Sequence, residues 1–424
     1  MKILLAGDLH IGRTSSRVPD SVSREPLRAA SAWLRLVELA ISEKVDLVCL
    51  SGDVVDRDNR FWEAIGPLRD GILRLAEAGA RTVAVAGNHD CDVLPRLARQ
   101  LPPESFTLLG RGGGWERIAI ESQDGRPALY VDGWSFTEPR FAGDPLDLYD
   151  LPPSAGAPAL GLLHGDLDNP SSGYAPLTSS RLRATGHAGW LLGHIHLPKL
   201  LESGPPWLLY PGSLQALDPG EVGAHGAWIT RLERGSLSEP ELRPLSSVRY
   251  ESTTISLDGI ETDSRIEEAL LAGVRREGER CTGGSPYLRC LALRVALRGR
   301  TPLADRVEAV VQGAVEGLEL PIDEAIACVE RTEVDALPEI DLEAHAGSQA
   351  PPGALARLLL ALESGEQGSE LEDLVRRTVA AVEQVDRSSA FESLAREEID
   401  ERLARKLLAA QARKLLSQLV RPER

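Results

Sequence analysis

The sequence has no long hydrophobic run, few cysteines and no excess of positive charge. No apolar stretch approaches the roughly 20 residues that a membrane-spanning helix requires, so a membrane protein is not expected. The five cysteines are irregularly spaced along 424 residues, which excludes a disulfide-stapled miniprotein and indicates reduced thiols. A strand-like run occupies residues 1–6 and leaves no room for a signal peptide. We therefore expect a cytoplasmic location.

The charge balance is acidic, with 47 Lys and Arg against 64 Asp and Glu, a net charge of −17 at pH 7. A protein whose whole task is to hold nucleic acid is usually basic, because phosphate neutralisation supplies most of the affinity. If this chain acts on DNA or RNA, metal ions, a local basic rim or a partner must hold the substrate. Hydrophobic residues at 42% and charged residues at 26% are typical of a globular protein.

The first part of the chain, residues 1–235, alternates strand-like and helical patterns. Short apolar runs that end at Gly, Asp, Asn or Pro are typical of strands. The predicted strands are Ile3–Ala6, Val45–Leu50, Thr82–Ala86, Trp115–Glu121, Ala128–Gly133, Ala159–Leu163, Trp190–Leu192 and Ala227–Leu232. Helical spacing of apolar residues predicts helices over Arg28–Ser42 and Phe61–Ala78. Some strands follow each other directly, which favours an α/β fold with a mixed sheet or two packed sheets and helices outside.

The rest of the chain predicts a smaller α+β domain and a helical tail. A polar segment with two prolines, Arg234–Pro244, is the expected boundary before a domain over residues 246–335. Residues 336–353 are the expected linker, since His345–Gly353 is rich in Gly, Ser, Ala and Pro. Residues 354–424 predict helices, the last from about Phe391 to Val420 with a basic end.

Five short segments share one design, a Gly-flanked turn after a strand-like run that carries His, Asp or Asn. They are Gly7-Asp8-Leu9-His10, Gly52-Asp53-Val54-Val55-Asp56, Gly87-Asn88-His89-Asp90, His164-Gly165 and Gly193-His194-Ile195-His196. Each alone can be a simple turn, because Asn and Gly favour turns. Their order, each after a strand-like run, favours one shared site.

These segments supply ligands of mixed chemistry. Side chains at i and i+2 of an extended segment point to the same side, so Asp8 and His10 can reach one ion together. Imidazole, carboxylate and amide oxygen suit Mn, Fe or Zn rather than Ca. The candidate ligands are Asp8, His10, Asp53, Asn88, His164, His194 and His196. Two ions about 3.5–4 Å apart that share a carboxylate would use them all.

Such a pair of ions suits the hydrolysis of a phosphate ester. It gives a bridging hydroxide near neutral pH, which attacks in line, and it neutralises the charge of the transition state. The leaving alkoxide still needs a proton or a positive partner. His89 beside Asn88 is the candidate for this role, with Asp90 available to orient it. Asp56 is interpreted as an outer partner or a helix N-cap, and His187 and His225 as structural or surface residues.

The ordered set resembles the calcineurin-like metallophosphoesterase superfamily. Two segments are similar to its DNA-repair nuclease branch, the Mre11 and SbcD nucleases and the YhaO-type exonucleases. They are Asp8-Leu9-His10-Ile11-Gly12-Arg13, similar to a D-x-H-x-G-R opening, and Tyr210-Pro211-Gly212-Ser213-Leu214-Gln215, similar to a Y-P-G-S/N segment. The resemblance covers about residues 1–230, and beyond them it is one of architecture.

The resemblance implies a β-sandwich flanked by helices, a smaller cap domain, and a helical tail that docks on the coiled-coil base of an SMC-like ATPase. It also implies two manganese ions. Asp8, His10 and His196 would hold the first ion, and Asn88, His164 and His194 the second. Asp53 would bridge the ions, and His89 would be the catalytic histidine, supported by Asp90. Asp56 departs from many archaeal and eukaryotic members, which have a second histidine at this position.

Three functions remain open at this level. The first is a metal-dependent DNA exonuclease, 3′-to-5′, that acts on linear or broken ends in DNA repair, either alone or as a homodimer or with an ATPase partner. The second is a phosphoesterase for a small nucleotide or a phosphoprotein. The third is a scaffold that uses metal only for stability. Candidate phosphate contacts flank the motif turns: Arg13, Arg17, Arg57, Arg60 and Arg181.

Overall fold

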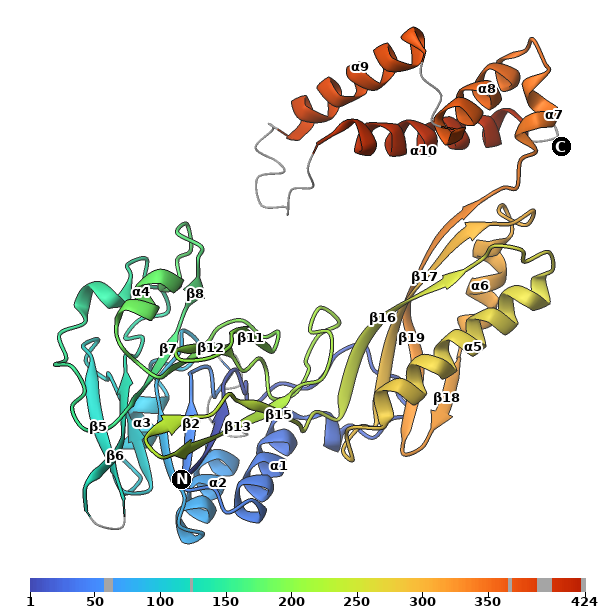
Figure 1. Cartoon of the computed structure of the whole chain (residues 1–424). Helices are drawn as coiled ribbons and strands as arrows, with labels where there is room; N and C mark the ends of the chain where they lie inside the picture. Colours follow the sequence, from blue (N-terminus) through green and yellow to red (C-terminus); the bar gives the residue numbers. More distant parts are fainter. Residues whose placement is uncertain (57–63, 123–124, 365–367, 387–398, 421–424) are drawn as a thin grey trace. The chain divides into compact units, whose positions relative to one another are not determined.

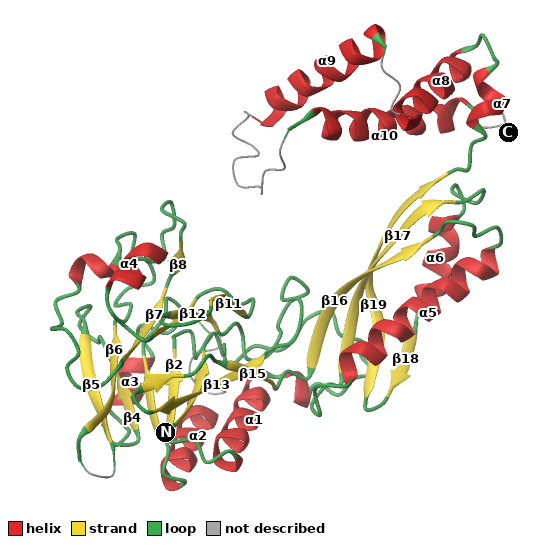
Figure 2. Cartoon of the chain, in the orientation of Figure 1, coloured by secondary structure: helices red, strands yellow, loops and turns green. Residues whose placement is uncertain are grey.

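The structure is a computed structural model that describes residues 1–56, 64–122, 125–364, 368–386 and 399–420 (Figure 1). The chain divides into two compact units. The first contains Met1–Thr253, Ala272–Arg294 and Gly317–Arg331, and the second contains Thr254–Leu271, Val295–Glu316 and Thr332–Arg424. Figure 2 shows the helices and strands of both. All five cysteines are buried and free.

The first sheet of the first unit has seven strands in the order β14-β13-β1-β2-β3-β4, and β15 pairs with β13. Four of them run parallel: β1 (Lys2–Ala6), β2 (Leu47–Leu50), β3 (Arg81–Ala84) and β4 (Phe106–Leu108). The antiparallel side consists of β13 (Gly226–Glu233), β14 (Ser236–Leu237) and β15 (Glu241–Pro244). The parallel strands therefore end at one edge of this sheet.

The second sheet has six strands in the order β11-β12-β10-β7-β6-β5. Its central strands are parallel: β12 (Trp207–Tyr210), β10 (Gly189–Gly193), β7 (Ala159–His164) and β6 (Pro127–Gly133). Antiparallel strands lie at both edges, β11 (Lys199–Glu202) and β5 (Glu116–Glu121). Two short strands, β8 (Asp166–Leu167) and β9 (Pro176–Leu177), form a separate pair.

Alternating side chains on β1 explain how the sheets and helices pack. Ile3 and Leu5 belong to a buried cluster that also contains Leu160 and Leu162 of the second sheet. Leu4 points the other way, into a cluster with residues of three helices. These helices are α1 (Ala29–Ser42), α2 (Ile65–Glu77) and α3 (Leu94–Ala98). Each fully buried large aliphatic side chain stabilises such a core by about 1.5–3 kcal/mol. The predicted α/β fold with two packed sheets and outer helices is confirmed.

The outer face of the second sheet has its own core. Trp190 and Leu192 of β10 pack there with Leu182 of α4 (Ser179–Ala184). Two short 3-10 helices, Glu25–Leu27 and Pro145–Leu148, complete this part of the chain.

Residues after 247 form a four-stranded sheet and several helices. The strand order is β16-β17-β19-β18, and the strands are β16 (Val248–Ser256), β17 (Cys290–Arg300), β19 (Ala325–Leu337) and β18 (Glu319–Ile322). The helices are α5 (Asp263–Thr282), α6 (Val307–Val315), α7 (Leu342–Ala346), α8 (Pro351–Ser364), α9 (Ser369–Asp386) and α10 (Glu401–Leu419). None of the helices in the described ranges combines the length and hydropathy that a membrane span needs.

Every strand expected in residues 1–235 is present, but two connecting segments differ from the prediction. Arg234–Pro244 is not a free boundary, because β15 pairs with β13 and extends the first sheet. The expected linker His345–Gly353 contains the end of α7 and the start of α8, where Pro351 stands at the first helical position. Proline is tolerated there because its missing N–H would have no partner in the helix. The domain boundaries otherwise stay predictions.

Candidate metal centre

The candidate ligands lie where strands of the two sheets end. Asp8 and His10 follow β1, Asp53 follows β2, and Asn88 and His89 follow β3. His164 is the last residue of β7, and His194 and His196 follow β10. Backbone hydrogen bonds join these turns, with the Asp8 amide donating to the Gly52 carbonyl at 3.1 Å and the Gly165 amide to the Gly193 carbonyl at 3.2 Å. The His89 amide donates to Asp53 Oδ1 at 2.8 Å and the His194 amide to Asp8 Oδ1 at 3.0 Å, so the five motif turns lie together, while their role as metal ligands stays a prediction.

Backbone conformation at these turns is unusual. Asp8, His10 and Asp53 have φ angles of 48°, 45° and 49°, and His194 has 99°. Non-glycine residues rarely adopt positive φ, and such residues cluster at functional sites. The turns also approach each other closely, since a Cβ on Gly87 would lie 2.2 Å from Asp53 Oδ1. A glycine is required at position 87 for this approach.

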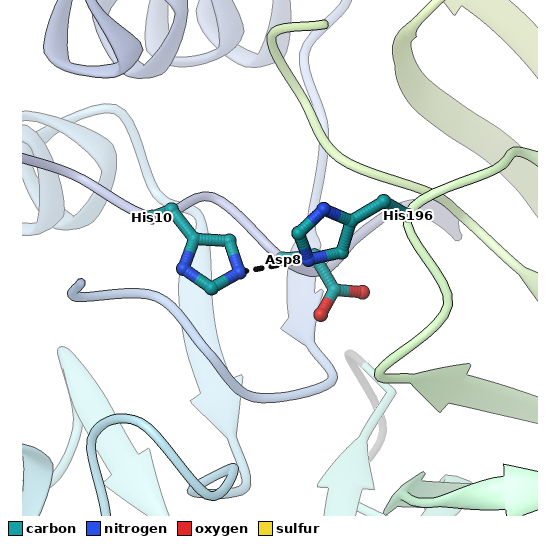
Figure 3. A group of neighbouring side chains, drawn as sticks. All are labelled: Asp8, His10 and His196. Atoms are coloured by element: carbon teal, nitrogen blue, oxygen red, sulfur yellow. Dashed lines mark hydrogen bonds between the residues drawn. The ribbon is translucent and has the colours of Figure 1, made fainter. Parts of the chain in front are cut away.

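The first ligand group contains Asp8, His10 and His196, whose ligating atoms lie within 4.8 Å of one another (Figure 3). The Nε2 atoms of His10 and His196 face each other at 3.0 Å. Their Nδ1 atoms contact carboxylates, His10 with Asp56 Oδ1 at 3.2 Å and His196 with Glu221 Oε1 at 2.8 Å. If each imidazole is neutral and donates from Nδ1, both Nε2 atoms keep a lone pair and the two lone pairs face each other. This donor set fits a shared cation.

Asp53 belongs to two further groups of this kind, one with Asp8 and His164 and one with His10 and His89. Its Oδ2 lies 3.4 Å from His164 Nε2, 3.9 Å from His10 Nε2 and 4.0 Å from His89 Nε2. Burial alone would raise the pKa of Asp53, but His164 outweighs it and holds this pKa well below its usual range. Burial would lower the pKa of His164, yet Asp53 raises it to about 9. The central position of Asp53 suits a carboxylate shared by two ions.

The remaining ligand candidates surround His164. Its Nε2 lies 3.0 Å from Asn88 Oδ1, and its Nδ1 lies 3.0 Å from the Ser51 carbonyl. With a pKa of about 9 the metal-free ring carries protons on both nitrogens, so Nδ1 donates to the Ser51 carbonyl and Nε2 to Asn88 Oδ1. A metal ion bound at Nε2 would have to displace that proton. The His194 ring lies 5.4 Å from the His164 ring, centroid to centroid, and the His194 amide donates to Asp8. Burial lowers the pKa of His194, which favours the neutral ring that a metal ligand needs.

His89 lies at the open side of this cluster. Its side chain is 34% exposed, its Nδ1 lies 3.8 Å from Asp56 Oδ1, and this Nδ1 has no hydrogen-bond partner among the described residues. Burial of the rest of the ring lowers the pKa of His89. The His89 ring can therefore contact a molecule that enters from the solvent while it stays next to Asp53.

Asp90 takes a different position from the one expected. Its carboxylate accepts hydrogen bonds from the backbone amides of Gly87 at 2.8 Å, Val54 at 2.6 Å and Val55 at 3.3 Å. Asp90 is fully buried, and burial together with the charge of Asp53 raises its pKa to about 7. The expectation that Asp90 orients the His89 ring needs correction, because these bonds tie two turns together and Asp56 is the carboxylate that faces the ring.

Glu221 and Ser213 were not predicted as partners of the site. Glu221 contacts the His196 ring, and Ser213 Oγ donates to Glu221 Oε2 at 2.6 Å. Glu221 lies 25 residues after His196 in the chain, so no local spacing marks it. The sequence marks Ser213 only as part of the Tyr210–Gln215 segment. The hydrogen-bond partner of a candidate metal ligand therefore depends on how loops that are far apart in the sequence pack against each other.

Three of the arginines proposed as phosphate contacts lie in the described residues, and two of these three pair with acidic residues. Arg13 pairs with Asp218 at 2.7 Å, and Arg181 pairs with Asp144 at 2.6 Å and Asp147 at 2.8 Å. Arg17 is exposed. Arg57 and Arg60 lie outside the described residues. Arg13 and Arg181 are therefore partly neutralised by neighbouring carboxylates.

Comparisons with known proteins agree with this geometry. Residues 1–198 match the family model of the calcineurin-like phosphoesterases. The uncharacterized metallophosphoesterase YhaO of Bacillus subtilis (strain 168) is 27% identical over 310 residues, which are 70% of this chain and 71% of YhaO.

Two other similarities are more distant. The DNA double-strand break repair protein Mre11 of Methanopyrus kandleri is 25% identical over 303 residues, which are 65% of this chain and 63% of Mre11. The chain thus spans less than two thirds of that relative. The crystal structure of TT1561 of Thermus thermophilus overlaps 57% of this chain and 97% of that chain, with 15% identity and a TM-score of 0.35. From the family match and the ligand set, we conclude that residues 1–198 of this chain form a calcineurin-like phosphoesterase domain, whose side chains include groups that could hold the metal ions of a hydrolase of this kind.

Proposed function

We propose that this hydrolase is a two-metal phosphodiesterase that cleaves DNA, as a 3′-to-5′ exonuclease in DNA repair. One observation carries the proposal. The carboxylate of Asp53 belongs to two of the ligand groups, one with Asp8 and His164 and the other with His10 and His89. A carboxylate shared between two ions is the arrangement that two-metal phosphoester hydrolysis requires. The similarity to a DNA double-strand break repair protein supports DNA as the substrate.

The ligands divide between two cations. Asp8, His10 and His196 would hold one, Asn88, His164 and His194 the other, and Asp53 both. When bound, the cations supply Lewis-acid stabilisation of the phosphate and a nucleophile at neutral pH. Manganese is the proposed ion, because the mixed nitrogen and oxygen set suits it.

The residues of the chain perform the other steps. His89 is partly exposed beside Asp53, so its ring can donate a proton or a hydrogen bond to the leaving oxygen. Asp56 faces Nδ1 of this ring and of His10, which favours their orientation toward the substrate side. Asp90 fixes the turn that presents Asn88 and His89 through its bonds to backbone amides. Asp56 and Asp90 together hold His89, the proposed acid, beside the residues that would bind the metal ions.

Substrate binding must overcome the acidic character of the chain. The net charge is −17, and Arg13 and Arg181 are paired with carboxylates. We therefore propose that the bound cations and a partner protein provide most of the attraction for DNA. The partner is an SMC-like coiled-coil ATPase that the tail recognises. In support of this, α10 exposes Leu407, Leu415 and Leu419 beside Lys406 and Lys414, a pattern that suits helix-in-groove binding.

The test uses the purified full chain, Mn²⁺ and linear duplex DNA labelled at either end. We expect stepwise release of nucleotides from the 3′ end, dependent on Mn²⁺ and absent from His89→Ala. If no DNA is cleaved, alone or with the ATPase, while a small diester is still hydrolysed, the nuclease proposal is wrong.

A second candidate is a phosphoesterase for a small nucleotide or a phosphoprotein. The acidic charge and the engaged arginines favour a substrate smaller than DNA. Turnover of bis-p-nitrophenyl phosphate can be compared with turnover of p-nitrophenyl phosphate. A clear preference for the monoester would support this candidate, and a preference for the diester would support the nuclease.

A further inference from the structure

The loop that follows β12 carries a carboxylate directed at one of the candidate ligands. We propose that Glu221 is a positioning residue for the metal centre, which holds the His196 ring so that its Nε2 faces the ion. This inference rests on the proposed two-metal site and adds a residue to it. It concerns metal binding, and its test therefore needs no DNA.

Glu221 is bonded on both of its oxygens. Oε1 lies 2.8 Å from His196 Nδ1, while Oε2 accepts from Ser213 Oγ at 2.6 Å and from the Leu217 amide at 2.8 Å. The residue is only 7% exposed. Because the Leu217 amide and the Ser213 hydroxyl both donate to Oε2, the other oxygen, Oε1, stays directed at the His196 ring. The carboxylate therefore has a fixed orientation before any ion binds.

The same loop also holds the backbone of His196. The Ser213 amide donates to the His196 carbonyl at 2.8 Å, and Ser213 forms a bridge with Gly7, the residue before Asp8. His225 Nδ1 lies 2.8 Å from the Ser213 carbonyl, behind this contact. Ser213 thus connects the main chain of His196, the Asp8 turn and the Glu221 carboxylate. The loop fixes both the backbone and the ring of one ligand.

The consequence for the ring follows from its chemistry. A neutral imidazole carries its proton on one nitrogen, and a carboxylate at Nδ1 accepts that proton's hydrogen bond. Nε2 is then left with the lone pair that a metal requires, 3.0 Å from Nε2 of His10. Without Glu221, the ring can rotate or place the proton on Nε2. Carboxylates that orient a metal-binding histidine typically change metal affinity by about 10–100-fold.

A second carboxylate–histidine pair in the same unit provides a matched control. Asp132 Oδ2 lies 3.0 Å from His187 Nε2, and both side chains are buried. Among the described residues, His187 belongs to no ligand group at the metal centre. Asp132→Asn and Glu221→Gln therefore make the same chemical change, from carboxylate to amide, beside a histidine ring; the His187 side chain is 1% exposed and the His196 side chain 26% exposed. Only the second change affects a candidate ligand.

The experiment measures Mn²⁺ binding to the full chain by calorimetry after metal removal. We expect Glu221→Ala to bind one of two ions about 10–100-fold more weakly than the wild type, and Asp132→Asn to bind both with wild-type affinity. Glu221→Gln should also bind Mn²⁺ more weakly than the wild type. A glutamine side chain has one acceptor oxygen and one NH₂ group, so its NH₂ donor would face another donor, either the His196 ring N–H or the Leu217 amide N–H. The nitrogen resonances of ¹⁵N-histidine report the ring directly. In metal-free wild type we expect the His196 proton on Nδ1, and in Glu221→Ala a mixture of both forms.

The outcomes separate this inference from the proposed function. Wild-type Mn²⁺ affinity in folded Glu221→Ala and Glu221→Gln, with an unchanged His196 resonance, would overturn the inference even if DNA is cleaved. A wild-type chain that binds two ions but leaves DNA intact would overturn only the nuclease proposal. Circular dichroism of each variant, compared with Asp132→Asn, shows whether a loss of binding reflects unfolding.

Discussion

Two buried histidine–carboxylate clusters in the first unit differ in how their polar atoms are matched. Around Asp132, the groups directed at the carboxylate are donors: Arg117 at 2.6 and 2.7 Å, the Tyr149 hydroxyl at 3.0 Å and His187 Nε2 at 3.0 Å. At the metal centre, the Nε2 atoms of His10 and His196 lie 3.0 Å apart, and each ring has its Nδ1 at a carboxylate oxygen. The Asp132 carboxylate has donors around it, whereas these two Nε2 atoms would both be acceptors if each Nδ1 carried the ring proton.

The comparison teaches that burial and polarity alone do not mark a functional site. Burial would raise the pKa of Asp132, but its bonds with Arg117 and His187 lower it, so the charged carboxylate is stable inside the protein. Buried polar groups are normally paired in this way. If the rings of His10 and His196 are neutral with their protons on Nδ1, the two Nε2 lone pairs lack such compensation. A bound cation would supply it, and this would distinguish the centre from a structural cluster.

The largest effect is expected from Asp53→Asn. The amide removes the charge that is shared between two ligand groups, so two-ion binding should be lost. We expect hydrolysis of bis-p-nitrophenyl phosphate to fall by more than about 10³-fold, and calorimetry to show fewer than two Mn²⁺ sites. If the variant keeps both ions and near-normal turnover, Asp53 is not the shared ligand and the contrast between the clusters weakens.

His89→Ala should separate catalysis from metal binding. His89 is an acid in our proposal and not a ligand, so metal content measured by mass spectrometry should stay at the wild-type level. Turnover should fall by about 10²–10⁴-fold, the usual contribution of a positioned acid or base. A loss of bound metal instead of turnover would assign His89 to the ligands, as its proximity to His10 and Asp53 also allows.

Metal should stabilise the fold through the metal centre alone. At a free Mn²⁺ concentration of 100 times the dissociation constant, the free energy of unfolding should rise by about 2.7 kcal/mol per site. Thermal melting with Mn²⁺ or with a chelator measures this shift in the wild type, Asp132→Asn and Asp53→Asn. Mn²⁺ should raise the melting temperature of the wild type and of Asp132→Asn, and it should raise that of Asp53→Asn only slightly. Equal gains in all three would place the bound ion elsewhere.

Asp132→Asn should reduce stability by about 2 kcal/mol at neutral pH, because it weakens the bonds from Arg117 and His187. The pKa of Asp132 is lowered from 3.8 in the folded state, so its stabilisation is present above that pH and is lost as the pH falls through the folded pKa. The gap between wild type and variant in urea unfolding should therefore narrow below pH 3.8. If the difference in the free energy of unfolding between wild type and Asp132→Asn does not change with pH, the charge of Asp132 does not stabilise the fold.

Much of the fold was predictable because its strands are short apolar runs that end at turn residues. β1, β7 and β10 are fully or almost fully buried, and their sequences contain little besides apolar residues and glycine before the final turn. The segment Arg234–Pro244 predicts a domain boundary because it is polar and contains two prolines. In the structure it is an edge of the first sheet, where β15 needs only one paired side. Composition does not distinguish an exposed edge strand from a loop.

By itself, the sequence determined which residues are candidate metal ligands. Side chains placed directly after buried parallel strands gather at one edge of their own sheet, but these candidates follow strands of two different sheets. The tertiary structure alone decided which group orients which ring. Asp90 is adjacent to His89 in the chain, yet its oxygens accept backbone amides, while Asp56 and Glu221 reach the ligand rings from other turns. Hydrogen-bond partners depend on distances between loops that are far apart in the sequence, and only the packing of the two sheets fixes those distances.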